Sequence, residues 1–317
     1  MKRLRMAAVV CLLVLAMIAA GCAGTEPVME PEPVTEEPAG QDEVFHFTVS
    51  ADMLAYHDAF GNLLQSIKEG PGLGVFHISI GDIKPIPANR AQIDDKFGTS
   101  AIWYPIIGNW EAGDTDAMNW LRSEYHDGNS LRAPLKNYTN QDGPTGSVET
   151  TYSWNHGNAC FIALNQYWDG GTAVGSDRTA SGDIVTELYD WLEQTLAANT
   201  KPFIFVFGHE PAFPYNRHVG DSLDAYPGNR DAFWSLLEAY NVQAFFVAHT
   251  HSYSKHQGDK HNTGKVWQLD VGNAGNDTNG DGLTYFDVLV GTDQVTIDVY
   301  RDNGTGVFSL AESINAS

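Results

Sequence analysis

Positive charge is scarce in this chain of 317 residues. Lysine and arginine together number 18 against 40 aspartates and glutamates, which gives a formal net charge of −22 at pH 7. A protein of this charge repels nucleic-acid backbones and anionic membrane surfaces, because both are negatively charged themselves. The composition therefore excludes tight electrostatic binding to a nucleic-acid backbone. A phosphate-bearing substrate needs metal ions to offset the charge.

Cysteine is also scarce. The chain has three cysteines, Cys11, Cys22 and Cys160, and the first two lie in an N-terminal segment that has the features of a targeting sequence. Because one cysteine remains in the body of the chain, no intrachain disulfide framework is expected. With 43% hydrophobic and 18% charged residues, the chain has the composition of a globular protein that is stabilised by burial.

The one long hydrophobic run lies at the N-terminus. Positive charges in Met1–Arg5 precede the apolar run Met6–Ala20. This run is about 15 residues long, whereas a helix that spans a bilayer needs roughly 20. We therefore interpret residues 1–21 as a signal peptide and not as a permanent membrane helix.

The residues at the end of this run indicate how the protein is attached. Ala19-Ala20-Gly21-Cys22 resembles the lipobox of bacterial lipoproteins, although that motif more often has leucine at the position of Ala19. The resemblance implies that Cys22 becomes the lipidated first residue of an extracytoplasmic protein, in the periplasm or at the cell surface, and that the lipid is its only membrane contact. An ordinary secretory signal with an incidental cysteine is the alternative.

Two regions are expected after the signal peptide. Residues 22–42 are rich in proline and glutamate and poor in large apolar groups, so we predict a disordered tether. Residues 43–317 show no second linker and no internal repeat, which favours one large domain.

The domain is predicted to have an α/β fold, because β-like runs alternate with helical patterns early in the chain and succeed one another late. Nine strands are predicted: Phe45–Ser50, Val75–Ile80, Tyr104–Ile107, Cys160–Asn165, Phe203–Phe207, Ala244–Val247, Val266–Val271, Tyr285–Val290 and Val295–Tyr300. Helices are predicted at 183–198 and near 58–68, 114–124 and 229–240.

Polar side chains of metal-binding types come directly after several of these strands. In α/β folds, ligands collect outside the carboxyl ends of the strands, so residues that are distant in sequence can meet there. Two carboxylates, an amide oxygen and imidazoles form a ligand set suited to divalent transition metals, here two ions of Mn, Fe or Zn. The predicted ligands, each at a strand end, are Asp52, Asp82, Asn109, His209, His249 and His251.

The motifs that contain these residues resemble those of the calcineurin-like metallophosphoesterase superfamily. In order they read V-S-A-D, G-D, G-N-W-E, F-G-H-E-P and A-H-T-H-S-Y. The resemblance implies two mixed β-sheets packed face to face between helices, and metal-dependent hydrolysis of a phosphate mono- or diester. It also implies that Asp82 bridges the two metals. By the same resemblance, Asn109, His209 and His249 complete one metal site. Asp52 and His251 serve the other.

The chain departs from the family pattern in the first motif. The family commonly has Asp-x-His there, but Met53 and Leu54 come after Asp52, so one ligand of the first metal is missing. Tyr56 or His57 could replace it, but each is better explained as a loop residue or a first-turn helix residue. Pro85 stands where purple acid phosphatases of this superfamily have a tyrosine ligand, so their colour is not expected.

Trp110 is the second departure, because it replaces the histidine that is thought to protonate the leaving group in family members. Such general acid catalysis contributes about 10²–10⁴ in rate, most of it for poor leaving groups. Arg217 as a phosphate clamp and His218 as a replacement acid are the candidates, and an ordinary surface loop is the alternative for both. A weakened or inactive relative that binds metal or a phosphorylated ligand at the cell surface therefore remains the competing function.

Overall fold

Strands rich in β-branched and aromatic residues build two sheets at the centre of the protein. The computed structural model describes residues 44–126, 143–148, 150–173, 175, 181–276, 281–302 and 304–316. The signal peptide, Cys22 and the tether, all predicted from sequence, lie outside these residues. The described residues belong to one unit, Ala39–Ser317.

The first sheet has the strand order β12-β11-β10-β1-β2-β3. Its strands are β1 (Phe45–Ser50), β2 (His77–Ile80), β3 (Trp103–Ile106), β10 (Thr284–Val290), β11 (Val295–Asp302) and β12 (Phe308–Asn315). β1, β2 and β3 are parallel, and β10 pairs antiparallel with β1. The carboxyl ends of three strands therefore meet at one edge of this sheet.

The second sheet has the strand order β4-β5-β6-β7-β9-β8. Its strands are β4 (Tyr152–His156), β5 (Ala159–Ala163), β6 (Phe203–Phe207), β7 (Ala244–Val247), β8 (Tyr253–Gln257) and β9 (Trp267–Val271). Strands β5, β6, β7 and β9 are parallel, and β4 and β8 close the two edges in the antiparallel direction. Both sheets are therefore mixed, as predicted.

Aromatic side chains fill the space between the two sheets. Phe47 of β1 lies 5.2 Å from Phe161 and 5.6 Å from Phe205, measured between ring centroids, so the first sheet contacts two strands of the second. Trp154 of β4 stacks on Tyr104 of β3 at 3.9 Å. Large aromatic rings bury much apolar area per residue, which fixes the sheets against each other.

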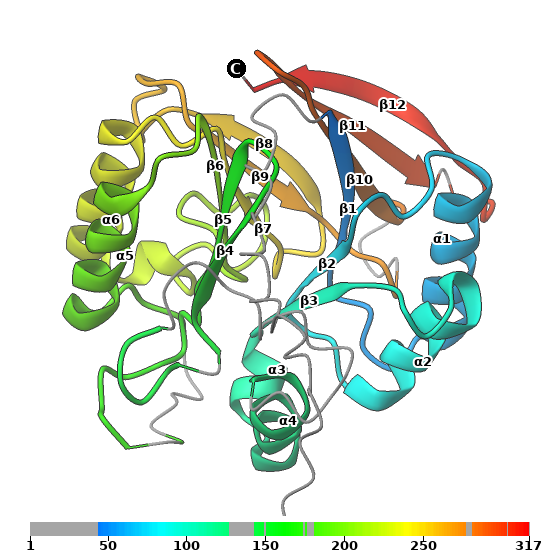
Figure 1. The fold of residues 1–317 in the computed structure, drawn as a ribbon, viewed down its shortest axis with the longest axis horizontal. Coiled ribbons are helices and arrows are strands. Elements are labelled where there is room, and N and C mark those ends of the chain that lie inside the picture. The colour runs from blue at the N-terminus through cyan, green and yellow to red at the C-terminus, as the bar shows by residue number, and fades with distance from the viewer. Residues whose placement is uncertain are drawn as a thin grey trace, which may run out of the picture. The chain divides into compact units, whose positions relative to one another are not determined.

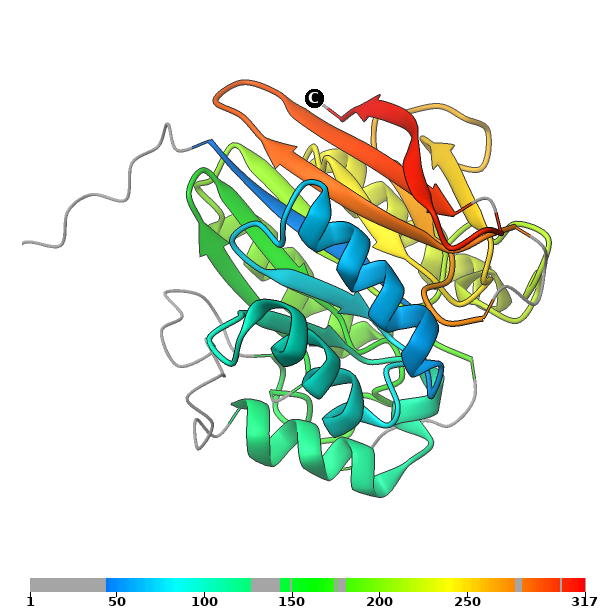
Figure 2. The ribbon, with the colours of Figure 1, turned by 90° about the vertical axis from the view of Figure 1, so that its right-hand side faces the viewer.

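Helices cover the outer faces of the sheets (Figure 1). α5 (Thr186–Ala198) and α6 (Pro227–Ala239) bury an apolar stripe in a core cluster on the second sheet. α1 (His57–Glu69) and α2 (Ile86–Phe97) lie over the first sheet, and Figure 2 shows α1 crossing in front of the blue and cyan strands. The arrangement is the four-layered α/β fold that the resemblance implied.

Shorter helices lie after β3 and before α6. They are α3 (Asn109–Ala112), α4 (Thr115–Trp120), the π-helix η1 (Leu121–His126) and the 3₁₀-helix η3 (Leu223–Ala225). α3 begins at a predicted ligand, so the loop after β3 turns directly into a helix at the edge of the sheet where β1–β3 end.

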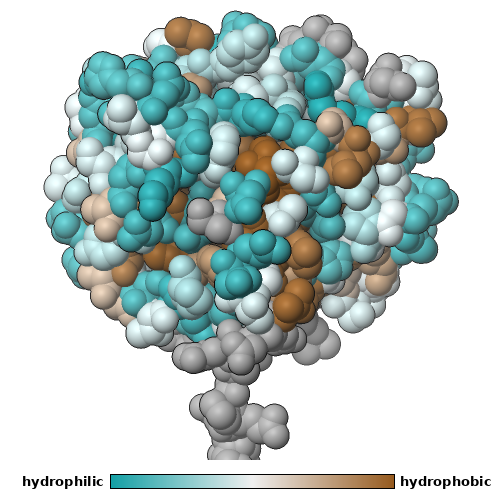
Figure 3. All heavy atoms as spheres, turned by 90° about the horizontal axis from the view of Figure 1, so that it is seen from above, coloured by the Kyte–Doolittle hydropathy of each residue, from teal (hydrophilic) through white to brown (hydrophobic). Residues whose placement is uncertain are grey.

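The face of the protein that Figure 3 shows from above is mostly hydrophilic, and its hydrophobic residues form separate spots. Within the part of the chain that the structure describes, no helix has both the length and the hydropathy that crossing a bilayer requires.

The predicted elements are all present in the structure, but helix α2 and three edge strands were not predicted. All nine predicted strands are present with bounds shifted by no more than a few residues, and the predicted helix at 114–124 divides into α4 and η1. Three strands were not predicted: β4, β8 and β12. Each is the outermost strand of a sheet, where one side lacks a neighbour and polar residues interrupt the apolar pattern.

Candidate metal centre

The predicted ligands lie at the carboxyl ends of parallel strands from both sheets. Asp52 comes after β1 and Asp82 after β2, while Asn109 begins α3 after β3. In the second sheet, His209 comes after β6, and the His249/His251 pair after β7. Strands of one direction bring these chain segments to the same end of the molecule, which is why a motif is found after each of them.

Asp52, Asp82 and His209 form a buried group suited to a metal ion. Their ligand atoms all lie within 4.8 Å of one another. His209 Nε2 is 3.5 Å from Asp82 Oδ1 and 3.9 Å from Asp52 Oδ1. All three side chains are almost completely shielded from solvent. The two sheets therefore contribute to one cluster, because His209 belongs to the second sheet and both aspartates belong to the first.

The two remaining histidines approach the same cluster. His251 Nε2 lies 3.8 Å from Asp52 Oδ1. The backbone N–H of His249 donates to Asp52 Oδ2 at 3.1 Å. The ring centroid of His249 is 5.0 Å from that of His209. The imidazole Nε2 of His249 is also 4.0 Å from Glu210 Oε1. The structure thus brings both histidines beside the Asp52–His209 side of the group.

Asn109 is placed next to Asp82 through the backbone. The N–H of Trp110, the residue after Asn109, donates to Asp82 Oδ1 at 3.2 Å. The Oδ1 atom of Asn109 is buried and has no hydrogen-bond partner. An amide oxygen in this state is costly to bury unless a cation or a donor meets it.

Unpartnered atoms of two other predicted ligands complete the same pattern. Asp52 Oδ1 and His209 Nε2 are buried without a hydrogen-bond partner. His209 Nδ1 lies 2.9 Å from the carbonyl oxygen of Ile80. Because a carbonyl only accepts, Nδ1 carries the proton and Nε2 presents a lone pair. These orphaned oxygen and nitrogen atoms fit a cation such as Mn, Fe or Zn.

The backbone at these ligands is held in an unusual conformation. Four of the predicted ligands have positive φ: Asp52 at 54°, Asp82 at 53°, His249 at 69° and His251 at 59°. Such residues cost free energy and persist where the surrounding structure fixes them, as at functional sites.

Two glycines allow the motifs to approach closely. A Cβ on Gly81, whose φ is +73°, would lie 2.2 Å from His209 Nδ1. A Cβ on Gly108 would lie 2.5 Å from Asp82 Oδ1. Side chains at either position would collide with predicted ligands, which explains why glycine precedes Asp82 and Asn109.

Burial is the largest cause of the pKa shifts in this group of side chains. It raises the pKa of Asp82 to about 7, and together with the Asp82 and Asp270 charges it raises the pKa of Asp52 well above the usual range. Burial lowers the pKa of both His209 and His251 to about 4. A bound cation reverses the effect on the carboxylates, since it stabilises their charged form.

Glu111 connects two of the motifs. Its carboxylate accepts the N–H groups of Asp82 at 2.9 Å, Ile83 at 2.9 Å and Gly108 at 3.0 Å. Burial, and after it the neighbouring Asp82 charge, raises the pKa of Glu111 to about 8. The residue therefore fixes the loops after β2 and β3 to each other.

Glu210 and Asp270 are further buried carboxylates beside the ligands. The Tyr167 hydroxyl donates to Glu210 Oε1 at 2.8 Å, and the Gly182 N–H donates to Oε2 at 2.8 Å. Asp270 accepts the hydroxyl of Thr250 at 2.6 Å, and Thr250 lies between the two β7 histidines. Burial raises the pKa of Glu210 to about 7 and that of Asp270 to about 8.

Sequence reasoning assigned no role to these supporting residues. Glu111 and Glu210 lie within the G-N-W-E and F-G-H-E-P motifs, so the motif glutamates were a usable signal. Tyr167 and Asp270 lie far from the motifs in sequence, and only the folded chain brings them to Glu210 and Thr250.

The loop after β6 carries Arg217 and His218 to the edge of the cluster. The His218 ring lies 3.9 Å from the His249 ring between centroids, at an interplanar angle of 33°. Both residues are partly buried, and an Arg217 guanidinium nitrogen is 3.4 Å from His218 Nε2. Burial, then the Arg217 charge, lowers the pKa of His218 below its usual value.

The structure shows where the residues that depart from the family pattern, and their possible replacements, lie. Met53 is fully buried in the core, and Leu54 donates its N–H to the carbonyl oxygen of Asp82. Tyr56 precedes α1 and accepts a hydrogen bond from Asn276, while His57 is the first residue of α1, as expected. Trp110 is 51% exposed and thus lies at the rim of the buried cluster.

A family model described as calcineurin-like phosphoesterase matches residues 45–253, which include every predicted ligand. The chain belongs to this family. The family assignment agrees with the two mixed sheets and with the buried Asp/Asp/His group of a metal site.

Solved structures show the same fold. A purple acid phosphatase, PPD1, from yellow lupin seeds has a TM-score of 0.59 at 14% identity, covering 87% of this chain and 54% of its own. PhoD has a TM-score of 0.58 at 12% identity, with 88% and 70% covered. GAP50 of Plasmodium, described as the anchor in the inner membrane complex, has a TM-score of 0.54 at 12% identity, with 86% and 89% covered.

The chain spans little more than half of the lupin phosphatase, and identities this low show the fold alone. No curated protein matches the chain.

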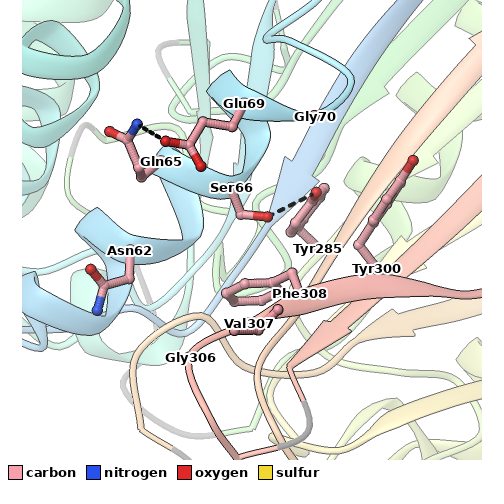
Figure 4. A pocket seen from close by; sticks show the side chains of 10 residues that line it. All are labelled: Asn62, Gln65, Ser66, Glu69, Gly70, Tyr285, Tyr300, Gly306, Val307 and Phe308. Carbon is pink, nitrogen blue, oxygen red and sulfur yellow. Dashed lines mark hydrogen bonds between the residues drawn. The ribbon is translucent and has the colours of Figure 1, made fainter.

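A separate hollow of about 380 Å³ lies between α1 and the β10–β12 side of the first sheet (Figure 4). Tyr285 and Tyr300 stack within it at 4.9 Å, and Ser66 of α1 lies 3.4 Å from the Tyr285 hydroxyl. None of the predicted metal ligands lines it. The group of predicted ligands is thus separate from this hollow.

Proposed function

We propose that the chain hydrolyses a phosphate mono- or diester with two metal ions. The observation that carries this proposal is the buried group of Asp52, Asp82 and His209, whose unpartnered Asp52 Oδ1 and His209 Nε2 atoms suit a cation. Asp82 would bridge the two ions. Asn109, His209 and His249 would complete one metal site, and Asp52 and His251 would serve the other.

Hydrogen bonds with neighbouring backbone groups orient these ligands. The Trp110 N–H donates to Asp82 Oδ1, and His209 Nδ1 donates to the Ile80 carbonyl oxygen, so each ligand presents a fixed atom. When bound, a metal pair supplies Lewis acidity that draws charge from the phosphate oxygens and activates water.

Arg217 and His218 are the proposed substrate-facing residues. A guanidinium beside the cluster binds phosphate oxygens with its fork of N–H donors. We assign to His218, whose ring lies against His249, the donation of a proton to the leaving oxygen. Its lowered pKa makes the protonated form a stronger acid but a less populated one at neutral pH.

The proposal includes attachment outside the cytoplasm. Lipidation of Cys22 would hold the domain on the membrane, while the acidic tether 22–42 keeps it at a distance. Labelling with a radioactive fatty acid tests this, because Cys22→Ala should abolish the label and release the protein from the membrane fraction. A label that persists in Cys22→Ala would contradict the assignment.

Metal analysis of the purified full chain, combined with hydrolysis assays, tests the enzymatic proposal. We expect bound Mn, Fe or Zn, and hydrolysis of an aryl phosphate or diaryl diester that Asp82→Asn abolishes. Asp190→Asn, an exposed acid on α5, is the matched control and should keep both metal and activity. Metal-free protein without hydrolysis at any added metal would exclude the proposed function.

A second function is supported by the two departures. Trp110 provides no titratable proton, and Leu54 stands at the position of the missing histidine. GAP50, a structure of similar fold, is described as an anchor, which is a binding role. A cell-surface protein that binds metal or a phosphorylated ligand would retain metal and show no turnover with any leaving group.

A further inference from the structure

Trp110 is an exposed aromatic side chain joined directly to the buried cluster. Its N–H donates to Asp82 Oδ1 at 3.2 Å, yet 51% of the residue is open to solvent. By contrast, Trp103, Trp154 and Trp234 are nearly inaccessible. An exposed indole at the rim of a polar site offers a flat apolar face on which an aromatic group of a ligand can stack.

Lys84 lies against this ring and is itself held in place. Its ammonium nitrogen is 5.7 Å from the Trp110 ring centroid and 2.6 Å from Asp114 Oδ2. The cation–π contact orients the indole, and the aspartate already balances the ammonium charge. The lysine is therefore a poor second phosphate site and a suitable positioning residue for Trp110.

An apolar pocket continues from the Lys84–Asp114 pair. It has a volume of about 290 Å³ and is lined by Lys84, Pro85, Ile86, Pro87, Asp114, Asp116, Ala117 and Trp120. Most of its lining residues are proline, aliphatic or aromatic, and the lining also includes two carboxylates and the Lys84 ammonium. Such a lining favours an uncharged apolar group and repels an anionic one.

We propose that Trp110 and this pocket form the subsite for the leaving group, and that the leaving group is a planar, uncharged aromatic alcohol. This inference rests on the proposed function, because the phosphate is placed at Asp82. The aromatic ring stacks on the exposed indole, and substituents extend toward Pro85 and Ile86. Lys84 acts as a positioning residue that holds the indole.

The chemistry of the leaving group agrees with this surface. Trp110 replaces a general acid, and a phenolate needs little protonation to depart because phenols are more acidic than alkyl alcohols. In the hydrolysis, the oxygen of a water molecule bonds to phosphorus and the water loses a proton to solvent. The bond from phosphorus to the aryl oxygen breaks, and this oxygen leaves with the electron pair as a phenolate, which takes up a proton from solvent. One substitution would thus remove a proton donor and supply a binding face for the substrates that do not need it.

Binding of non-hydrolysable analogues tests the subsite without requiring turnover. Titration calorimetry on the metal-loaded full chain compares phenylphosphonate with methylphosphonate. We expect phenylphosphonate to bind about 10-fold more tightly, in the range of an aromatic contact. Trp110→Leu should reduce this ratio to near one, and Trp110→Phe should retain part of it, while methylphosphonate affinity changes less than two-fold in both.

Lys84→Met tests the positioning role. We expect it to lower the phenyl-to-methyl affinity ratio without removing it, because the indole remains but is less ordered. Lys260→Met is the matched control, since Lys260 forms a 2.6 Å ion pair with Asp231 in another part of the surface. It should leave the ratio unchanged.

Failure of the subsite and failure of the enzyme can be distinguished. Phenyl and methyl phosphate esters are assayed in parallel with the binding measurements. A Trp110-dependent phenyl preference in binding supports the subsite even if no ester is hydrolysed. Equal phenyl and methyl affinity in the wild type, or a ratio unchanged in Trp110→Leu, overturns it even if hydrolysis is fast.

Discussion

The carboxylate of Glu111 accepts the backbone N–H of Asp82 at 2.9 Å. This bond links the helix that begins at Asn109 to the residue proposed to bridge two metals. Because Glu111 also accepts the N–H of Gly108, one buried side chain fixes the loops after two neighbouring strands. The position of the bridging carboxylate therefore depends on a residue that is not itself a proposed ligand.

Glu111→Ala should weaken metal binding by about 10- to 100-fold, as loss of a supporting hydrogen-bond partner does at metal sites. Three N–H groups lose their acceptor, so the free energy of unfolding should also fall by roughly 1–3 kcal/mol. Metal titration and urea unfolding measure the two effects. Glu111→Gln keeps one acceptor oxygen and should lie between; wild-type metal affinity in Glu111→Ala would contradict the supporting role.

Gly81→Ala should disrupt the centre, because the added Cβ would lie 2.2 Å from His209 Nδ1 in a backbone with φ of +73°. Gly72→Ala is a matched control with φ of +85° and no atom within 4 Å of the new Cβ. The control should show only the backbone penalty, about 1–2 kcal/mol. Urea unfolding and metal content separate the variants, and equal losses in both would contradict the close-approach argument.

Trp110→His should restore a proton donor beside Asp82. We expect the hydrolysis of alkyl esters to rise, by up to about 10²-fold, and that of aryl esters to change much less, because poor leaving groups depend most on protonation. The ratio of kcat/KM for methyl and phenyl phosphate measures this. No gain for alkyl esters at unchanged metal content would show that position 110 does not control protonation.

His218→Gln tests the proposed replacement acid. If His218 protonates the leaving oxygen, kcat for alkyl esters should fall by about 10²-fold while aryl esters are little affected. The pKa of His218 is below its usual value, so the limb of the pH–rate profile assigned to this acid should lie below about pH 6.5. Loss of that limb in His218→Gln supports the role, and an unchanged profile excludes it.

His77 should make stability depend on acid pH away from the candidate centre. It is fully buried between the hydroxyls of Thr48 and Ser50, and burial lowers its pKa to about 3. The unfolded state binds the proton more readily below about pH 6.5. His77 therefore lowers the free energy of unfolding as pH falls from about 6.5 toward 3, by at most about 1.4 kcal/mol per pH unit.

His77→Gln removes this titration but keeps polar contact with one hydroxyl. Urea unfolding of metal-free protein at several pH values should show a shallower loss of stability in the variant than in the wild type. Identical pH slopes for the two proteins would contradict the assignment. The comparison cancels the contributions of the histidines at the centre, which both proteins share.

The interior strands could be predicted because their sequences carry the signal of burial. β6 and β7 are apolar at every position and fully buried, so their bounds can be read from composition alone. β8 and β12 could not be found in this way, because edge strands expose polar residues such as those of Tyr253–Gln257. Their pairing depends on neighbours that are distant in the chain.

The amino-acid sequence by itself determined the motifs, their order and their places at strand ends, since short-range patterns record which segments are strands and which residues come directly after them. The tertiary structure decided the distances. His209 and Asp82 meet at 3.5 Å only because two sheets pack face to face. The exposure of Trp110, the Lys84 contact and the supporting bonds of Glu111 and Tyr167 likewise depend on packing between segments far apart in the chain, which local patterns do not encode.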